Sequence, residues 1–117
     1  MAKIKVGNAI HEALGRNGFL QVEQEPLYTV PAVAQIEIDS LICYNTDGAH
    51  TSTVTLYVEL SGGTSRVLLS QDLAPGERLQ SEGGPLHLNE HDKLKGKATY
   101  ADEVTWFMSG LLVHTVS

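Results

Sequence analysis

The most constraining stretch of the sequence runs from residue 27 to residue 60, where apolar residues recur at every second position on both sides of a turn-forming cluster. The cluster is Asn45-Thr46-Asp47-Gly48. The alternating apolar residues are Ile36, Ile38, Ile42 and Tyr44 before it, then Val54, Leu56, Val58 and Leu60 after it. Because successive side chains of a strand point to opposite faces, the pattern predicts two half-buried antiparallel strands over 35–44 and 53–60.

The rest of the chain repeats this plan. Further strands are expected at 27–30, 66–73, 78–81, 86–88, 93–100 and 104–116. Turn signals separate them; in Ala74-Pro75-Gly76-Glu77, proline presets one backbone angle of the turn and glycine accepts the next. Strands spaced by about ten residues, with no convincing helical segment, predict an all-β fold. We expect an antiparallel β-sandwich of Greek-key or jelly-roll type with about seven or eight strands.

Residues 1–22 lack a sustained apolar period. Residues 11–14 have the composition of one helical turn, but Gly15 follows before a helix reaches a stable length. We therefore expect an extended N-terminal arm or a peripheral strand here, with a short strand around Phe19–Val22. Residues 23–117 then form a single β-sandwich domain, because 117 residues suffice for one domain with its own core.

Charge is unevenly distributed along the chain. The formal net charge is −6, yet residues 1–22 hold Lys3, Lys5 and Arg16 against Glu12 alone, so a basic segment of +2 precedes an acidic body of −8. An acidic body disfavours non-specific binding to nucleic acid, whose phosphates require lysine and arginine. The basic segment instead suits an acidic protein partner.

Cysteine content and hydropathy limit the cellular context. Cys43 is the only cysteine in the sequence, so no internal disulfide can form. The N-terminus shows no apolar run of signal-peptide length. No stretch reaches the roughly twenty apolar residues that a membrane helix needs. We therefore expect no membrane partner and synthesis in a reducing cytoplasm.

Two groups of polar residues have the composition of a reactive site. Asp47, His50 and Ser52 bring an acid, an imidazole and a hydroxyl into one loop, but a catalytic triad needs a base held between its partners by a rigid scaffold. His87 and His91 are four residues apart, a spacing that places metal ligands together on a helix and not in a strand and turn. The sequence therefore predicts no catalytic residues, no cofactor and no metal site.

The last expected strand is apolar on both faces. Trp106, Met108 and Leu112 share one phase, whereas Phe107, Leu111 and Val113 share the other. Such a strand lies centrally in a sheet or at an interface between copies.

We expect Trp106, Phe107 and Leu111 to contact sister copies. Lys3, Lys5, Arg16 and Phe19 of the N-terminal segment would contact a neighbouring subunit. A sugar-binding platform is the alternative for the aromatic residues, and it requires them to be exposed.

At the level of strand and turn order, the sequence resembles small β-sandwich structural proteins of tailed bacteriophages over residues 27–114. The matching segments are Leu27-Tyr28-Thr29-Val30-Pro31, Cys43-Tyr44-Asn45-Thr46, Val54-Thr55-Leu56-Tyr57-Val58, Gly62-Gly63, Leu73-Ala74-Pro75-Gly76-Glu77, Leu86–Leu88, Asp92, Lys97-Ala98-Thr99-Tyr100-Ala101 and Val104–Val113. The resemblance implies a non-enzymatic component of the virion, made in the host cytoplasm and usually oligomeric. It carries no catalytic residues with it.

On this basis we expect a head decoration or cement protein that binds the major capsid protein or other virion subunits. Two alternatives remain open. The first is a structural protein of the tail, neck or fibre, and the second is a carbohydrate-binding β-sandwich module. An enzyme is the least supported class, because no strong catalytic constellation is present.

Overall fold

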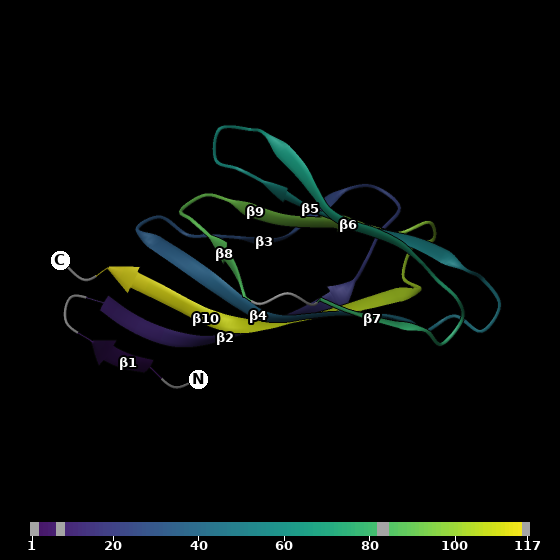
Figure 1. The fold of residues 1–117 in the computed structure, drawn as a ribbon, viewed down its shortest axis with the longest axis horizontal. Helices are drawn as coiled ribbons and strands as arrows, with labels where there is room; N and C mark the ends of the chain where they lie inside the picture. Colours follow the sequence, from purple (N-terminus) through teal and green to yellow (C-terminus); the bar gives the residue numbers. More distant parts are fainter. Residues whose placement is uncertain (1–2, 7–8, 82–84, 116–117) are drawn as a thin grey trace.

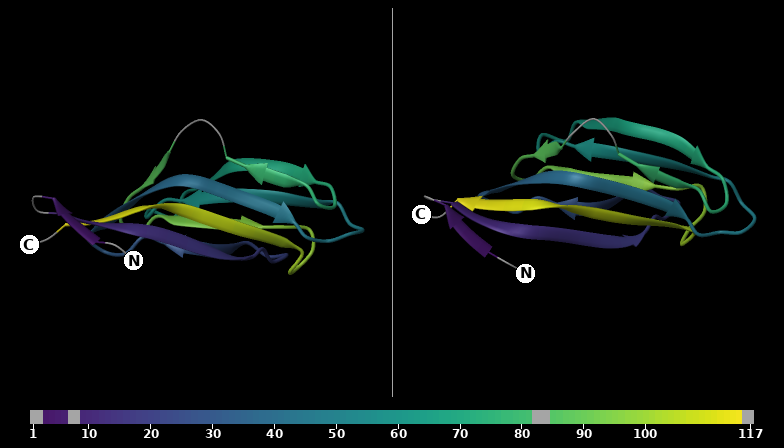
Figure 2. Two further views of the ribbon diagram at one scale, coloured as in Figure 1. Left: turned by 90° about the horizontal axis from the view of Figure 1, so that it is seen from below. Right: turned by 60° about the horizontal axis from the view of Figure 1, so that its bottom comes forward.

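The protein folds as two antiparallel β-sheets packed face to face (Figure 1, Figure 2). This is a computed structural model, and it describes residues 3–6, 9–81 and 85–115. Sheet A contains, in spatial order, β1 (Lys3–Val6), β2 (Ala9–Phe19), β10 (Val104–Thr115), β4 (Ala34–Asn45) and β7 (Arg78–Gln80), with β8 (Leu86–Leu88) also paired to β4. Sheet B contains β3 (Glu25–Thr29), β9 (Lys93–Lys97), β5 (Ser52–Glu59) and β6 (Ser65–Leu73). The predicted β-sandwich is therefore confirmed.

The strands expected from the sequence correspond in order to β3 through β10. The described residues form ten strands instead of seven or eight, because the N-terminal segment adds β1 and β2. No helix in the described part of the chain is long and apolar enough to cross a membrane.

Residues 9–19, expected in an extended arm or a peripheral strand, form β2 between β1 and β10. Eleven residue pairs join β2 to β10, from Ala9 opposite Thr115 to Phe19 opposite Thr105. The strand also contributes Leu14 to the core. Gly18 faces the indole of Trp106, where a Cβ would lie 3.2 Å from Nε1. The glycines that argued against regular structure are therefore accommodated because a long partner strand supplies the hydrogen-bond ladder.

A β-bulge in β4 reverses which of its side chains face the core. Ser109 pairs with Ser40 and Gly110 pairs with Ile38, which leaves Asp39 as an extra residue. An extra residue shifts the two-residue period, so the inward face changes from Ile36 and Ile38 to Leu41 and Cys43. The alternation in the sequence predicts that Ile42 and Tyr44 share a face with Ile36 and Ile38, and this prediction is wrong.

The core lies between the two sheets and draws on nearly every strand. Its buried members include Leu14 and Leu20, Ile36 and Ile38, Val54, Leu56 and Val58, Leu94, and Val104, Trp106, Met108 and Leu112. On β10 the phase of Trp106, Met108 and Leu112 faces this core. The strand lies centrally in sheet A between β2 and β4, one of the two positions that its two apolar faces predicted.

Gly110 is required by the close approach of β10 to the bulge. A Cβ at this position would overlap the carbonyl oxygen of Glu37 and lie 3.0 Å from the Cα of Ile38. Both neighbours are backbone atoms, which cannot move aside without breaking the ladder.

We predict that Gly110→Ala lowers the free energy of unfolding by about 1–3 kcal/mol or more, as overpacking does. Denaturant unfolding followed by circular dichroism measures the change. Gly15→Ala is the matched control in a neighbouring strand, because nothing lies within 4 Å of its Cβ position. Equal stability of the two variants would show that the bulge is not as tight as described.

Candidate functional site

The outer face of sheet A carries a cluster of exposed aromatic side chains. Phe19, Tyr44 and Phe107 are 49%, 40% and 48% exposed. Thr105 pairs with both Phe19 and Tyr44, and in the next outward row Phe107 pairs with Ile42. Because directly paired residues project from the same face of a sheet, these side chains form one surface across β2, β10 and β4. We call Phe19, Ile42, Tyr44 and Phe107 the aromatic face.

Shallow hollows flank Phe107 on this surface. One extends toward Asn17 and Ser109, and another extends toward Tyr44 and Arg78. A broad surface with an aromatic centre and a polar rim is typical of protein–protein contact sites, whereas small-molecule sites are concave and enclose most of the ligand.

The aromatic face includes part of the interface expected from the sequence. Phe19 and Phe107 belong to it, and Leu111 lies half-buried further along the outer side of β10. Trp106 does not belong to it, because its indole is only 6% exposed and packs in the core. Tyr44 was missed, because the bulge that turns it outward has no sequence signature.

The three basic residues expected at the interface lie on two different strands. Arg16 lies in β2, and its guanidinium carbon is 5.4 Å from the ring centroid of Tyr28, a cation–π contact between the two sheets. Lys3 and Lys5 lie in β1 at the edge of sheet A, opposite Glu12 and Ile10 in the register.

Cys43 belongs to the inward face of β4. Its side chain is buried, and removal from water raises the pKa of the thiol to about 12. This disfavours reaction at Cys43, since the thiolate is the reactive form of cysteine.

A cluster of polar side chains lies at one end of the sandwich, where the loop after β4 meets the turn before β10. The start of β10 brings the two together, because Val104 pairs with Asn45. Both the backbone N–H and the hydroxyl of Thr46 donate to the carbonyl oxygen of Glu103, each at 2.8 Å.

Buried Asn45 organises the loop that follows it. Its side-chain amide donates to the carbonyl oxygens of His50 and Leu73, both at 2.9 Å, and its side-chain oxygen accepts from the N–H of Asp47 at 3.0 Å. Every polar atom of this side chain is thus used to hold loop 46–51 in one conformation.

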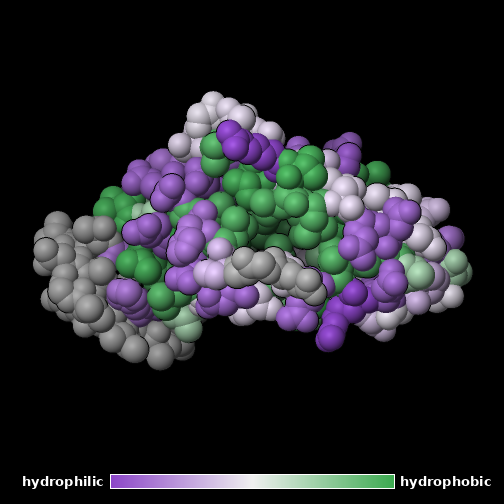
Figure 3. Space-filling model, in the orientation of Figure 1, coloured by the Kyte–Doolittle hydropathy of each residue, from purple (hydrophilic) through white to green (hydrophobic). Residues whose placement is uncertain are grey.

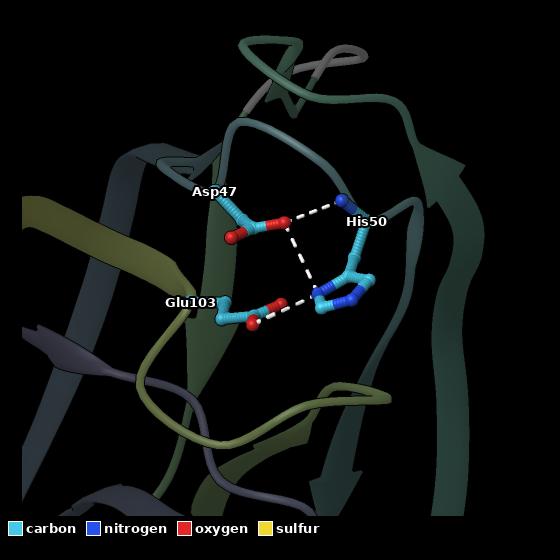
Figure 4. A group of neighbouring side chains, drawn as sticks. All are labelled: Asp47, His50 and Glu103. Carbon is cyan, nitrogen blue, oxygen red and sulfur yellow. Dashed lines mark hydrogen bonds and ion pairs between the residues drawn. The ribbon is translucent and has the colours of Figure 1, made fainter.

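The cluster itself consists of Asp47, His50 and Glu103 (Figure 4). Nδ1 of His50 lies 3.2 Å from Oδ2 of Asp47 and 3.2 Å from Oε1 of Glu103. Oδ2 of Asp47 also accepts from the backbone N–H groups of His50 and Ala49. These backbone donors lower the pKa of the Asp47 carboxyl, because they stabilise its charged form.

The sequence pointed to only part of this cluster. Asp47 and His50 were considered with Ser52, but Ser52 is buried in β5, where its hydroxyl accepts from the N–H of Thr99 at 3.1 Å. Glu103 was missed because it follows His50 by 53 residues and meets it only through the pairing of β4 with β10.

The histidines considered as metal ligands lie elsewhere. His87 in β8 is opposite Glu37 in the register. His91 is in the turn before β9, with Nε2 3.0 Å from Oε1 of Glu90. Among the described residues, the group of three with metal-ligating atoms close together is Asp47, His50 and Glu103.

We predict that Asn45→Ala lowers the free energy of unfolding by about 1–3 kcal/mol, because buried carbonyl groups lose their donor. Denaturant unfolding monitored by circular dichroism measures this loss. Asn17→Ala, an exposed position on the outer face of sheet A, serves as control and should change stability by less than about 0.5 kcal/mol. A loss no larger than that of the control would mean that Asn45 does not hold the loop.

Comparison with known proteins identifies the fold. No protein-family model matches the sequence, and no curated protein matches it. Among solved structures, the chain is similar to a pilus subunit of Bacillus endospore appendages, with a TM-score of 0.55, 15% identity and complete coverage of both chains. It is also similar to a capsid protein of Helicobacter pylori bacteriophage KHP30, with a TM-score of 0.53 and 11% identity over 96% of this chain and 91% of that chain. At these identities the similarity establishes a shared β fold.

Proposed function

We propose that this protein is a non-enzymatic structural subunit of a virus particle and that it works by binding other subunits. The aromatic face is the observation that carries this proposal. Its three exposed aromatic rings lie on one sheet surface, and removing such a surface from water favours association by about 25 cal/mol per Å² before ordering costs. Even a modest contact area can hold a particle together when symmetry repeats the contact many times.

The similar structures support a role in assembly. One of them belongs to the capsid of a bacteriophage and the other to disulfide-linked pili. Disulfide linkage between copies does not suit this chain, because Cys43 is its only cysteine and lies buried in β4. A non-covalent contact through the aromatic face therefore fits a capsid-type subunit better than a disulfide-linked pilus subunit.

The position in the particle that we favour is head decoration. In this role the aromatic face would contact the major capsid protein or a sister copy in a homo-oligomer. Lys3 and Lys5, in the edge strand β1, would add a basic contact to an acidic neighbour. A structural protein of the tail, neck or fibre would use the same surfaces in fewer copies.

A carbohydrate-binding module is the competing function. Trp106 cannot serve as its platform, because the indole is in the core. Tyr44 and Phe107 would have to stack on the sugar instead. Glycan addition would then change the NMR signals of these two rings at concentrations that leave the oligomeric state unchanged.

The copy number of this chain relative to the major capsid protein, measured by quantitative mass spectrometry of purified particles, tests the proposal. A number comparable to that of the capsid subunit supports decoration. A few to a few dozen copies would move the protein to the neck, tail or fibre. Absence from particles would overturn the virion role.

We predict that Phe107→Ser reduces incorporation into particles by at least about tenfold, the loss expected when a central interface residue worth about 1.4 kcal/mol or more is truncated. Mass spectrometry of purified particles measures the incorporation. Val22→Ser is the control, because it removes an exposed apolar residue away from the aromatic face. Similar incorporation of both variants would rule out the aromatic face as the contact surface.

A further inference from the structure

Three potential ligand atoms converge at the end of the sandwich, one from each of Asp47, His50 and Glu103. They all lie within 4.8 Å of one another, and they come from two segments that the pairing of β4 with β10 brings side by side (Figure 4). Ligand atoms bound to a tetrahedral Zn²⁺ at about 2.1 Å lie about 3.4 Å from one another. The separations of 3.2 Å from Nδ1 of His50 to the two carboxylate oxygens are close to this value.

Hydrogen bonding within the cluster leaves more acceptors than donors. Nδ1 of His50 carries at most one hydrogen, yet two carboxylate oxygens lie at the same distance from it. Oε2 of Glu103 is buried and has no hydrogen-bond partner among the described residues. A buried carboxylate oxygen without a partner is costly. A cation bound by the Glu103 carboxylate would offset this cost.

The scaffold around the cluster already fixes two of the ligands. Backbone N–H groups of Ala49 and His50 orient the carboxylate of Asp47, and Asn45 holds the carbonyl oxygen of His50. The imidazole of His50 stacks on the ring of Tyr100, with centroids 4.5 Å apart. Such outer contacts orient metal ligands and are part of a metal site.

We propose that Asp47, His50 and Glu103 form a binding site for a divalent transition-metal ion, with Zn²⁺ as the best-fitting candidate. One imidazole nitrogen and two carboxylate oxygens are ligands that Zn²⁺ accepts, whereas Ca²⁺ and Mg²⁺ prefer oxygen atoms alone. His50 is 50% exposed, so the ion can reach the site from solvent, and water or a group from a neighbouring subunit supplies the fourth ligand.

The ion would join loop 46–51 to the turn that precedes β10. Asp47 and His50 stand on the loop and Glu103 stands on the turn, so coordination adds a cross-link to the hydrogen bonds between Thr46 and Glu103. Because the ion binds the folded chain, it stabilises that state in proportion to its concentration. This role is independent of the contact surface on the outer face of sheet A.

Isothermal titration of Zn²⁺ into the full chain, after treatment with a chelator, tests the site. We expect one Zn²⁺ per chain and a melting temperature that rises with Zn²⁺ concentration. Glu103→Gln keeps the size of the side chain but removes its charge, and it should weaken Zn²⁺ binding by at least about tenfold. Co²⁺ in place of Zn²⁺ should give the visible absorption of a tetrahedral site in the wild-type protein and lose it in this variant.

Glu90→Gln is the matched control, because Glu90 lies in a different turn, where it contacts His91 and accepts a hydrogen bond from the backbone N–H of Val33. This variant should bind Zn²⁺ as the wild type does. Three results would each overturn the proposal: no Zn²⁺ binding by the wild-type chain, equal affinity of the Glu90→Gln and Glu103→Gln variants, or Ca²⁺ binding as tight as Zn²⁺ binding. His50→Gln provides a second test of the ligand set, since it removes the imidazole and leaves both carboxylates.

Discussion

The backbone hydrogen bonds of β10 hold sheet A together, because this strand pairs along its length with β2 on one side and β4 on the other. The last strand of the chain thereby joins a segment from the N-terminus to one from the first half of the sequence. Its two apolar faces lie in different environments. Trp106, Met108 and Leu112 fill the core, whereas Phe107 and Leu111 lie on the outer side of the sheet.

The bulge opposite Gly110 determines which side chains of β4 lie on the outer face of sheet A. If β4 kept a regular period, Ile42 and Tyr44 would face the core with Ile36 and Ile38. The extra residue at Asp39 instead turns them outward beside Phe107. The same shift brings Cys43 inward, where its thiol is buried and its pKa is raised. One local irregularity therefore places Ile42 and Tyr44 on the aromatic face and Cys43 in the core.

The end of the sandwich depends on a different kind of interaction. Asn45 holds loop 46–51 by two hydrogen bonds to its backbone and makes a third to the carbonyl oxygen of Leu73 at the end of β6. Thr46 joins this loop to Glu103. These contacts place the carboxylate of Glu103 against the imidazole of His50. The polar end and the aromatic face are separate surfaces, so the proposed metal site and the proposed contact surface share no residues.

The sequence by itself determined the all-β class, eight of the strands and the two apolar phases of β10, because alternation and turn residues are local features of the sequence. Only the tertiary structure decided that residues 9–19 join sheet A, that Tyr44 faces outward and that Glu103 meets Asp47 and His50. Each of these depends on pairing with β10, which lies dozens of residues away from β2 and β4. Strand partners and bulges are set by such long-range contacts, and residue spacing does not encode them.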